Sequence, residues 1–266
     1  MKIRIISAIV ILAILGPVFL QGGMLFNLTM WIIGLLGLKE FLDIRGSKKA
    51  LPEFMKLISY ILFTLITLVN MTNQELIFSI DFRVITGLFI SMLLPVTLYH
   101  DSKKYSINDA FYLIGGIFFL GVSFNLLIVL RNIELNLLLY LFTITIMTDT
   151  YAYIGGLLVG KHPLLVSISP KKTIEGMMLG TLFGTFIACV FYHIVVNPNL
   201  SLMVVIVMTL FLSILGQFGD LAFSAIKRYF GKKDFSNLIP GHGGILDRLD
   251  SIIFVVLGFI FFIAII

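Results

Sequence analysis

The sequence predicts an all-α integral membrane protein with about nine transmembrane helices. Hydrophobic residues make up 59% of its 266 residues and charged residues 12%, whereas soluble domains average roughly 45–50% and about 25%. The apolar residues form continuous runs without strand-like alternation, which favours helices with internally satisfied backbones over a β-barrel. A soluble fold is therefore nearly excluded. Cys189 is the single cysteine, which excludes an intrachain disulfide and a cysteine-cluster zinc site.

Nine apolar runs supply the predicted helices. Several are shorter than the roughly 20 residues that cross a bilayer, so their ends are approximate. The first run follows Lys2 and Arg4 and has no A-x-A cleavage signal, which indicates a retained span rather than a signal peptide. The runs cover residues 5–22, 24–38, 57–70, 84–99, 109–130, 136–158, 175–196, 200–222 and 251–266.

The basic residues predict how these spans are oriented. Seventeen of the 19 lysines and arginines fall in alternate connecting segments, and only Arg83 and Arg131 fall in the others. Because cytoplasmic segments carry the excess of basic residues, we expect a cytoplasmic N-terminus and an external C-terminus. The short basic clusters indicate anionic lipid headgroups or phosphates as partners, and not nucleic acid, despite the net charge of +5.

The chain is predicted to form one helical assembly without long repeats or low-complexity linkers. Residues 1–135 supply N-terminal transmembrane helices, and residues 136–266 form a catalytic transmembrane region with two cytoplasmic motif loops. Gly176, Gly180 and Gly184 form two overlapping G-x-x-x-G units in the seventh run. These units permit close helix packing, either within the chain or between two copies.

Two carboxylates, Asp149 and Asp220, lie near or within apolar runs. An ionised carboxylate near the bilayer centre costs about 2.5–3.5 kcal/mol on insertion scales, so each needs a compensating partner. Both are candidate functional residues. A hydrated position at the cytoplasmic interface, or pairing with a lysine, is the structural alternative.

The segment between the eighth and ninth runs is dense in polar side chains for so apolar a chain. Gly243 and Gly244, beside His242, permit close approach of the backbone to a ligand. Asp247 and Asp250 share one helix face if the last helix begins near Gly244. Such hard oxygen ligands suit Mg²⁺, while acids that favour a helix N-terminus are the structural alternative.

A second polar segment joins the sixth and seventh runs on the same side of the membrane. Ser169 is predicted to be a helix N-cap, with Pro170 at the first helical position. Lys171 and Lys172 would then lie at a helix N-terminus, where free N–H groups and the dipole attract phosphate. The alternative is a cytoplasmic anchor of two lysines.

Together these residues resemble the signature of phosphatidate cytidylyltransferases, also called CDP-diacylglycerol synthases. The similarity is strong from about residue 145 to the C-terminus and includes Asp149-Thr150, Ala152-Tyr153, residues 169–173 and Glu175-Gly176. Thirteen positions follow the signature without gaps, namely Ser224, Lys227, Arg228, Lys233, Asp234, Ser236, Pro240, His242, Gly243, Gly244, Asp247, Arg248 and Asp250.

The resemblance implies a homodimeric enzyme in the cell membrane, with its active site at the cytoplasmic face. Such an enzyme condenses CTP with phosphatidic acid from the lipid bilayer, releases pyrophosphate and needs Mg²⁺, and a second or monovalent cation is compatible with it. Asp220 and Asp247 are the expected metal ligands, with Asp250 and Asp149 as further candidates. The other expected site residues are His242, Lys227 and Arg228 for catalysis, and Lys171, Lys172, Ser169, Gly243, Gly244, Arg248 and Lys233 for substrate binding.

Two other functions are compatible with parts of the pattern. A CTP-dependent polyprenol or phytol kinase would release CDP rather than pyrophosphate, and the thirteen-position match argues against it. A transporter would use Asp149 and Asp220 as an ion path. The clustering of the remaining polar groups on one face argues against a through-route.

The predicted topology can be tested by cysteine-accessibility labelling. Single cysteines introduced at positions 165 and 240, in a Cys189→Ser background, should both react with a membrane-impermeant reagent only when it reaches the cytoplasmic face, because both motif loops belong to the basic set of segments. Labelling of the two positions from opposite faces would contradict the nine-span arrangement.

Overall fold

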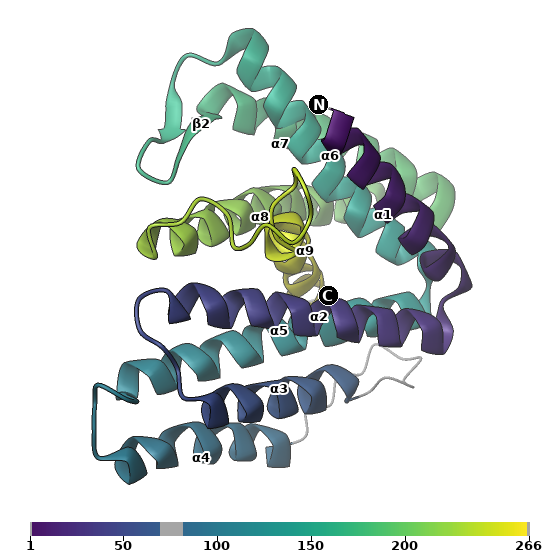
Figure 1. Ribbon diagram of the computed structural model, residues 1–266. Helices are drawn as coiled ribbons and strands as arrows, with labels where there is room; N and C mark the ends of the chain where they lie inside the picture. The colour runs from purple at the N-terminus through teal and green to yellow at the C-terminus, as the bar shows by residue number, and fades with distance from the viewer. Residues whose placement is uncertain (1, 70–81, 265–266) are drawn as a thin grey trace. The chain divides into compact units, whose positions relative to one another are not determined.

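The computed structural model describes residues 2–69 and 82–264, and each predicted apolar run overlaps one helix there, although several helix ends differ from the predicted ones (Figure 1). Position 70 of the third run and positions 265 and 266 of the ninth lie outside the described residues. The helices are α1 (Lys2–Gln21), α2 (Gly23–Gly46), α3 (Glu53–Leu68), α4 (Phe82–Tyr99), α5 (Ile107–Ile133), α6 (Leu135–Val159), α7 (Ile174–Phe191), α8 (Leu202–Tyr229) and α9 (Leu246–Ile263). A short π-helical turn, Tyr192–Val196, extends α7.

Six helices among the described residues are long and apolar enough to cross a membrane. They are α2, α4, α5, α6, α7 with its π-helical extension, and α8. The all-helical membrane character predicted from composition is therefore confirmed. Nine crossings and the orientation of the two termini stay predictions.

The chain divides into two compact units, each of which has its own packed interior. Unit 1 contains Met1–Ile133 and Asp234–Asp247, and unit 2 contains Glu134–Lys233 and Arg248–Ile266. The segment that follows α8 therefore returns to pack with the N-terminal helices, while most of α9 packs with α8.

In unit 1, α5 packs against α2, α3 and α4 (Figure 1). Fully buried side chains such as Phe63 and Phe124 meet edge to face, with ring centroids 6.1 Å apart. Asp109 is completely buried at the start of α5, where it forms ion pairs with Arg45 and Lys49 and accepts a 2.7 Å hydrogen bond from the Ser106 hydroxyl. These contacts balance a charge that would otherwise be costly to bury.

In unit 2, α6 and α7 pack closely along their lengths, and α8 packs against both. Polar side chains bridge the helices, with Tyr140 Oη and Thr209 Oγ1 2.7 Å apart and Thr148 Oγ1 and Ser213 Oγ also 2.7 Å apart. Such bonds between helices are favoured where no water can satisfy a buried hydroxyl.

The G-x-x-x-G glycines of α7 face α6 within the same chain. A Cβ on Gly180 would lie 2.6 Å from both the Cβ of Ala152 and the carbonyl oxygen of Thr148. Gly176 and Gly184 meet the same face of α6. In the structure these glycines therefore allow α7 to pack closely against α6 of the same chain.

The segment between α6 and α7 does not follow the predicted helix start. Residues Ser169–Thr173 form strand β2, which pairs antiparallel with β1 (Pro163–Leu165). The actual N-cap of α7 is Thr173, whose Oγ1 accepts a hydrogen bond from the Gly176 amide. The N-cap prediction for Ser169 is wrong because strand pairing satisfies this backbone before the helix begins.

We expect the close contact between α6 and α7 to tolerate no added side chain. Gly180→Ala should lower the free energy of unfolding by about 1–3 kcal/mol, the usual cost of overpacking, because its methyl group would press on the α6 backbone. Gly87→Ala in α4 is the matched control, since nothing lies within 4 Å of its Cβ position. Thermal unfolding in detergent should therefore separate the two variants, and equal midpoints would contradict the packing.

Candidate active site

Three carboxylates come together in unit 2, one from each of three helices. Asp149 lies in α6, Asp220 in α8 and Asp250 in α9; the charge of Asp220 acts on both Asp149 and Asp250, and that of Asp149 acts on Asp250. Ser251 Oγ lies 3.4 Å from Asp149 Oδ2, and Ser224 Oγ lies 3.3 Å from Asp220 Oδ1. We name these three acids the carboxylate cluster.

Two lysines balance part of this negative charge. Lys172, on strand β2, forms an ion pair with Asp220. Lys227, in the last turn of α8, is only 7% exposed and its charge acts on Asp250. Three carboxyl groups from three helices thus lie among two ammonium groups.

The donor chemistry of the carboxylate cluster fits a hard divalent cation. Mg²⁺ usually takes one or two carboxylates and completes its octahedron with water and substrate phosphate, so it does not require a cage of three protein ligands. No such cage of three His, Cys, Asp or Glu side chains occurs among residues 2–69 and 82–264. The ion pair with Lys172 shows that Asp220 is accessible to a cationic partner.

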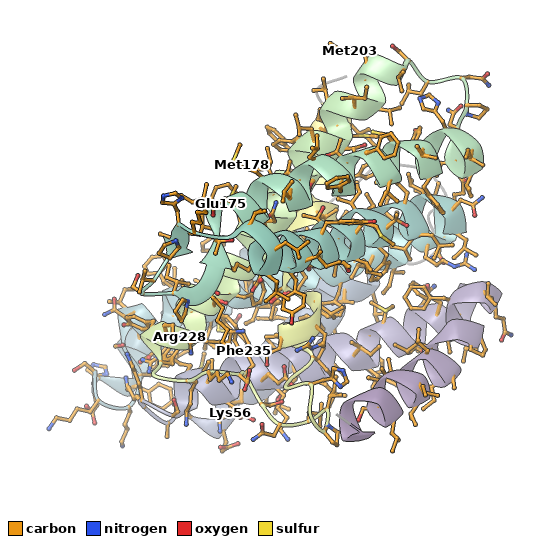
Figure 2. All side chains as sticks on the ribbon, turned by 90° about the horizontal axis from the view of Figure 1, so that it is seen from above. Lys56, Glu175, Met178, Met203, Arg228 and Phe235 are labelled. Atoms are coloured by element: carbon orange, nitrogen blue, oxygen red, sulfur yellow. The ribbon has the colours of Figure 1, made fainter. Side chains whose placement is uncertain are left out.

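Basic side chains surround the end of α8 in unit 2. Arg228 is labelled in Figure 2. It donates to the carbonyl oxygens of Ile168, at 3.3 Å, and Lys232, at 2.9 Å, and so links the β-hairpin to this end of the helix. Lys171 is exposed on strand β2. Lys233 is exposed in the segment after α8. This arrangement is suited to binding phosphate groups.

The segment Asp234–Asp247 of unit 1, here called the glycine loop, is organised by Asp247. Oδ2 of Asp247 accepts hydrogen bonds from the amides of Phe235 and Gly244, both at 2.9 Å. The loop reverses at Gly241 and Gly243, which have φ values of 77° and 86° that favour glycine. A bridge between Ile239 and Gly243 closes the turn. Phe235, at the start of the loop, is labelled in Figure 2.

A further acid, Glu40 of α2, contacts the glycine loop within unit 1. Its carboxylate accepts hydrogen bonds from the Ser236 hydroxyl and from the amides of Ile245 and Leu246. Glu40 is only 4% exposed. Sequence reasoning missed it because it stands among Lys39, Asp43 and Arg45 and so resembles part of a charged helix end at the membrane surface.

The remaining predicted residues are placed as follows. His242 is half-buried, and its amide donates to the Ile239 carbonyl at 2.9 Å. Ser169 is half-buried in β2, opposite Leu165. Arg248 is exposed in the first turn of α9. The structure thus joins Asp149, Asp220, Asp250, Lys172 and Lys227 in one cluster, and joins Gly243, Gly244 and Asp247 in the glycine loop.

The family of this chain is shown by its similarity to known proteins. The sequence matches the profile of the cytidylyltransferase family over residues 2–266. The chain belongs to this family. The match includes both the carboxylate cluster and the glycine loop, so the resemblance seen in the signature residues is confirmed over nearly the whole length.

Several bacterial relatives of this cytidylyltransferase-family chain carry the name phosphatidate cytidylyltransferase. The protein of Staphylococcus haemolyticus is 35% identical over 256 residues, and that of Staphylococcus saprophyticus is 34% identical over 255 residues. The protein of Staphylococcus aureus strain COL is 34% identical over 260 residues. In each comparison the alignment covers 96% of this chain and 96% of the relative.

Gly243 is expected to be essential for the conformation of the glycine loop. Gly243→Ala should reduce turnover per folded molecule roughly 10- to 100-fold, because small misplacements of a binding loop have effects of this size. The residue has a positive φ, and an added Cβ would lie 2.9 Å from Asp247 Oδ2.

Gly231→Ala is the matched control for this substitution. Gly231 also has a positive φ, of 68°, but nothing lies within 4 Å of its Cβ position. The control should lose about 1–2 kcal/mol of stability from backbone strain and keep its turnover per folded molecule. Equal turnover in the two variants would show that the Gly243 turn has only a general structural role.

Proposed function

We propose that this chain transfers the CMP moiety of CTP to phosphatidic acid, forming CDP-diacylglycerol and pyrophosphate for phospholipid synthesis. The observation that carries the proposal is the family match over residues 2–266, together with full-length relatives named phosphatidate cytidylyltransferase. The apolar helices supply the setting that a lipid substrate requires. The cluster of acids and lysines in unit 2 supplies groups suited to phosphoryl chemistry.

The reaction balances with no covalent enzyme intermediate. A phosphate oxygen of phosphatidic acid attacks the α-phosphorus of CTP, the bond from that phosphorus to the β-phosphate oxygen breaks, and pyrophosphate leaves. Such transfers depend on positioning and on neutralising charge rather than on a protein nucleophile. Lys172 and Lys227, with Lys171, Arg228 and Lys233 around the same helix end, can bind the phosphates and hold them in line.

Mg²⁺ is the metal proposed for this site, with a second or monovalent cation compatible with it. When bound, it would neutralise the transferring phosphoryl group and the leaving pyrophosphate. Asp220 and Asp247 are the proposed ligands, with Asp250 and Asp149 as further ligands or as hydrogen-bonding support. The oxygen-only donors of the carboxylate cluster support the assignment of Asp220, and the family signature supports that of Asp247.

The proposal also includes the setting of the enzyme. A cytoplasmic active site is supported by the positions of 17 of the 19 basic residues in one set of connecting segments. A homodimer in the cell membrane is supported by the resemblance to phosphatidate cytidylyltransferases. His242 and Arg248 are proposed to orient phosphate groups, since both adjoin the residues that fold the glycine loop.

The experiment that tests the function uses the purified full-length protein. It is incubated in detergent–lipid micelles with CTP, phosphatidic acid and Mg²⁺, followed by analysis of both the lipid and the nucleotide products. CDP-diacylglycerol and pyrophosphate in equal amounts are expected. Release of CDP with a phosphorylated polyprenol would instead identify a lipid kinase, and ion flux into liposomes without nucleotide turnover would identify a transporter.

The metal assignment predicts that Asp220→Asn and Asp247→Asn each reduce turnover about 100-fold or more while leaving a folded protein, because the amide keeps the shape but removes the anion that holds Mg²⁺. If both acids hold one metal, the double variant should be little worse than either single variant. Raised Mg²⁺ should partly restore the single variants. Turnover measured across a Mg²⁺ titration checks all three expectations.

Asp101→Asn is the control for these substitutions. Asp101 lies outside both motif segments, and its Oδ1 accepts from the Lys103 amide, a bond that asparagine can keep. This variant should retain normal turnover and Mg²⁺ dependence. Normal turnover in well-folded Asp220→Asn and Asp247→Asn proteins would refute the two ligand assignments.

A further inference from the structure

Glu40 is a buried acid in α2 that is far in sequence from the signature residues it contacts. The hydroxyl of Ser236 donates to Glu40 Oε1 at 2.6 Å. The amide of Ile245 donates to the same oxygen at 2.9 Å, and the amide of Leu246 donates to Oε2 at 2.9 Å. The carboxylate therefore contacts both the beginning and the end of the glycine loop.

The chemistry of these donors explains why an anion is stable in a buried position. Ile245 and Leu246 lie at the start of α9, where backbone N–H groups have no partner within the helix. A carboxylate there accepts charge-assisted hydrogen bonds and interacts favourably with the helix dipole. The Ser236 hydroxyl and these two amides therefore stabilise the charge of Glu40.

The absence of a side chain at Gly244 leaves room for the Glu40 carboxylate. A Cβ on Gly244 would lie 2.6 Å from both Oε1 and Oε2 of Glu40. No side chain other than hydrogen fits there without displacing the acid. Gly244 is itself buried, and its amide donates to Asp247 Oδ2 at 2.9 Å. Glu40 from α2 and Asp247 from α9 thus fix the same few peptide groups from two sides.

We propose that Glu40 is a positioning residue for the reaction, which holds the glycine loop in its working conformation through Ser236 and the first amides of α9. The inference rests on the proposed cytidylyltransferase activity and extends its machinery to the N-terminal helices of unit 1. Glu40 acts through the loop, so its removal changes the placement of groups such as Gly243 and His242. It leaves the carboxylate cluster chemically intact.

The test compares Glu40→Gln with Asp43→Asn in the full-length protein. Both substitutions remove one negative charge from α2, but Asp43 is exposed and lies one turn further along the helix. Hydrogen exchange of the peptides that cover residues 236–248 should be faster in Glu40→Gln and unchanged in Asp43→Asn. Turnover per folded molecule should fall about 10- to 100-fold in Glu40→Gln only, since misplaced binding groups cost this much.

Two further variants keep the test decisive if Glu40→Gln folds poorly. Ser236→Ala removes one of the three donors and should show a smaller effect in the same direction. Gly244→Ala places a methyl group against the Glu40 carboxylate and so disturbs the same contact from the loop side. Because both variants disturb the same contact, the combined effect of Ser236→Ala and Gly244→Ala should be clearly less than additive.

The outcomes separate the inference from the proposed function. Unchanged exchange in residues 236–248 of Glu40→Gln would overturn the contact, and faster exchange with normal turnover would overturn the positioning role. A lower melting midpoint with normal turnover per folded molecule would also overturn it, because it identifies a general structural role. Absence of CDP-diacylglycerol formation by the unsubstituted protein would instead overturn the proposed function, while the exchange comparison would still decide whether Glu40 holds the loop.

Discussion

Carboxylates buried among apolar helices must be compensated by specific partners, and this constraint organises both units of the chain. An ionised acid without a partner is costly in surroundings that lack water. Asp109 is compensated by the cations Arg45 and Lys49. Glu40 is compensated by a hydroxyl and two backbone amides. The half-buried Asp220 is compensated by Lys172 on strand β2.

These kinds of compensation have different consequences for function. An acid held by backbone amides fixes the backbone that surrounds it, because those amides cannot move without leaving the charge unpaired. Glu40 and Asp247 are of this kind, and they hold the glycine loop. An acid held by a flexible lysine can exchange that partner for another cation. Asp220 is of this kind, and it therefore fits a role in binding charged substrates and metal.

Hydropathy was sufficient to predict where each helix lies, because a bilayer requires long apolar segments with internally bonded backbones. The match between the predicted runs and α1 to α9 follows from this single requirement. The β-hairpin of residues 163–173 was not predictable in the same way, since Ser169 and Pro170 are suitable for a helix start and only the pairing with Pro163–Leu165 decides otherwise. Asp149, Asp220 and Asp250 were found as intramembrane or signature acids. Their grouping depends on how three helices pack, which no local sequence pattern records.

The contacts of Glu40 were also not predictable from its neighbours in the sequence. Its neighbours in sequence are charged residues at a helix end, and nothing in that pattern distinguishes an acid exposed to water from one that binds a loop 196 residues away.

The hairpin also changes what the two adjacent lysines can do. Successive side chains of a strand point to opposite faces, so Lys171 and Lys172 cannot act as one anchor at a helix N-terminus. Lys172 is half-buried and paired with Asp220, whereas Lys171 is exposed. In the proposed reaction, a phosphate with its cation would bind at the carboxylate cluster, and the ammonium of Lys172 would move from the carboxylate to a phosphate oxygen without leaving the site. The strand, held to the end of α8 through the bond from Arg228 to the Ile168 carbonyl, keeps that ammonium within reach of both partners.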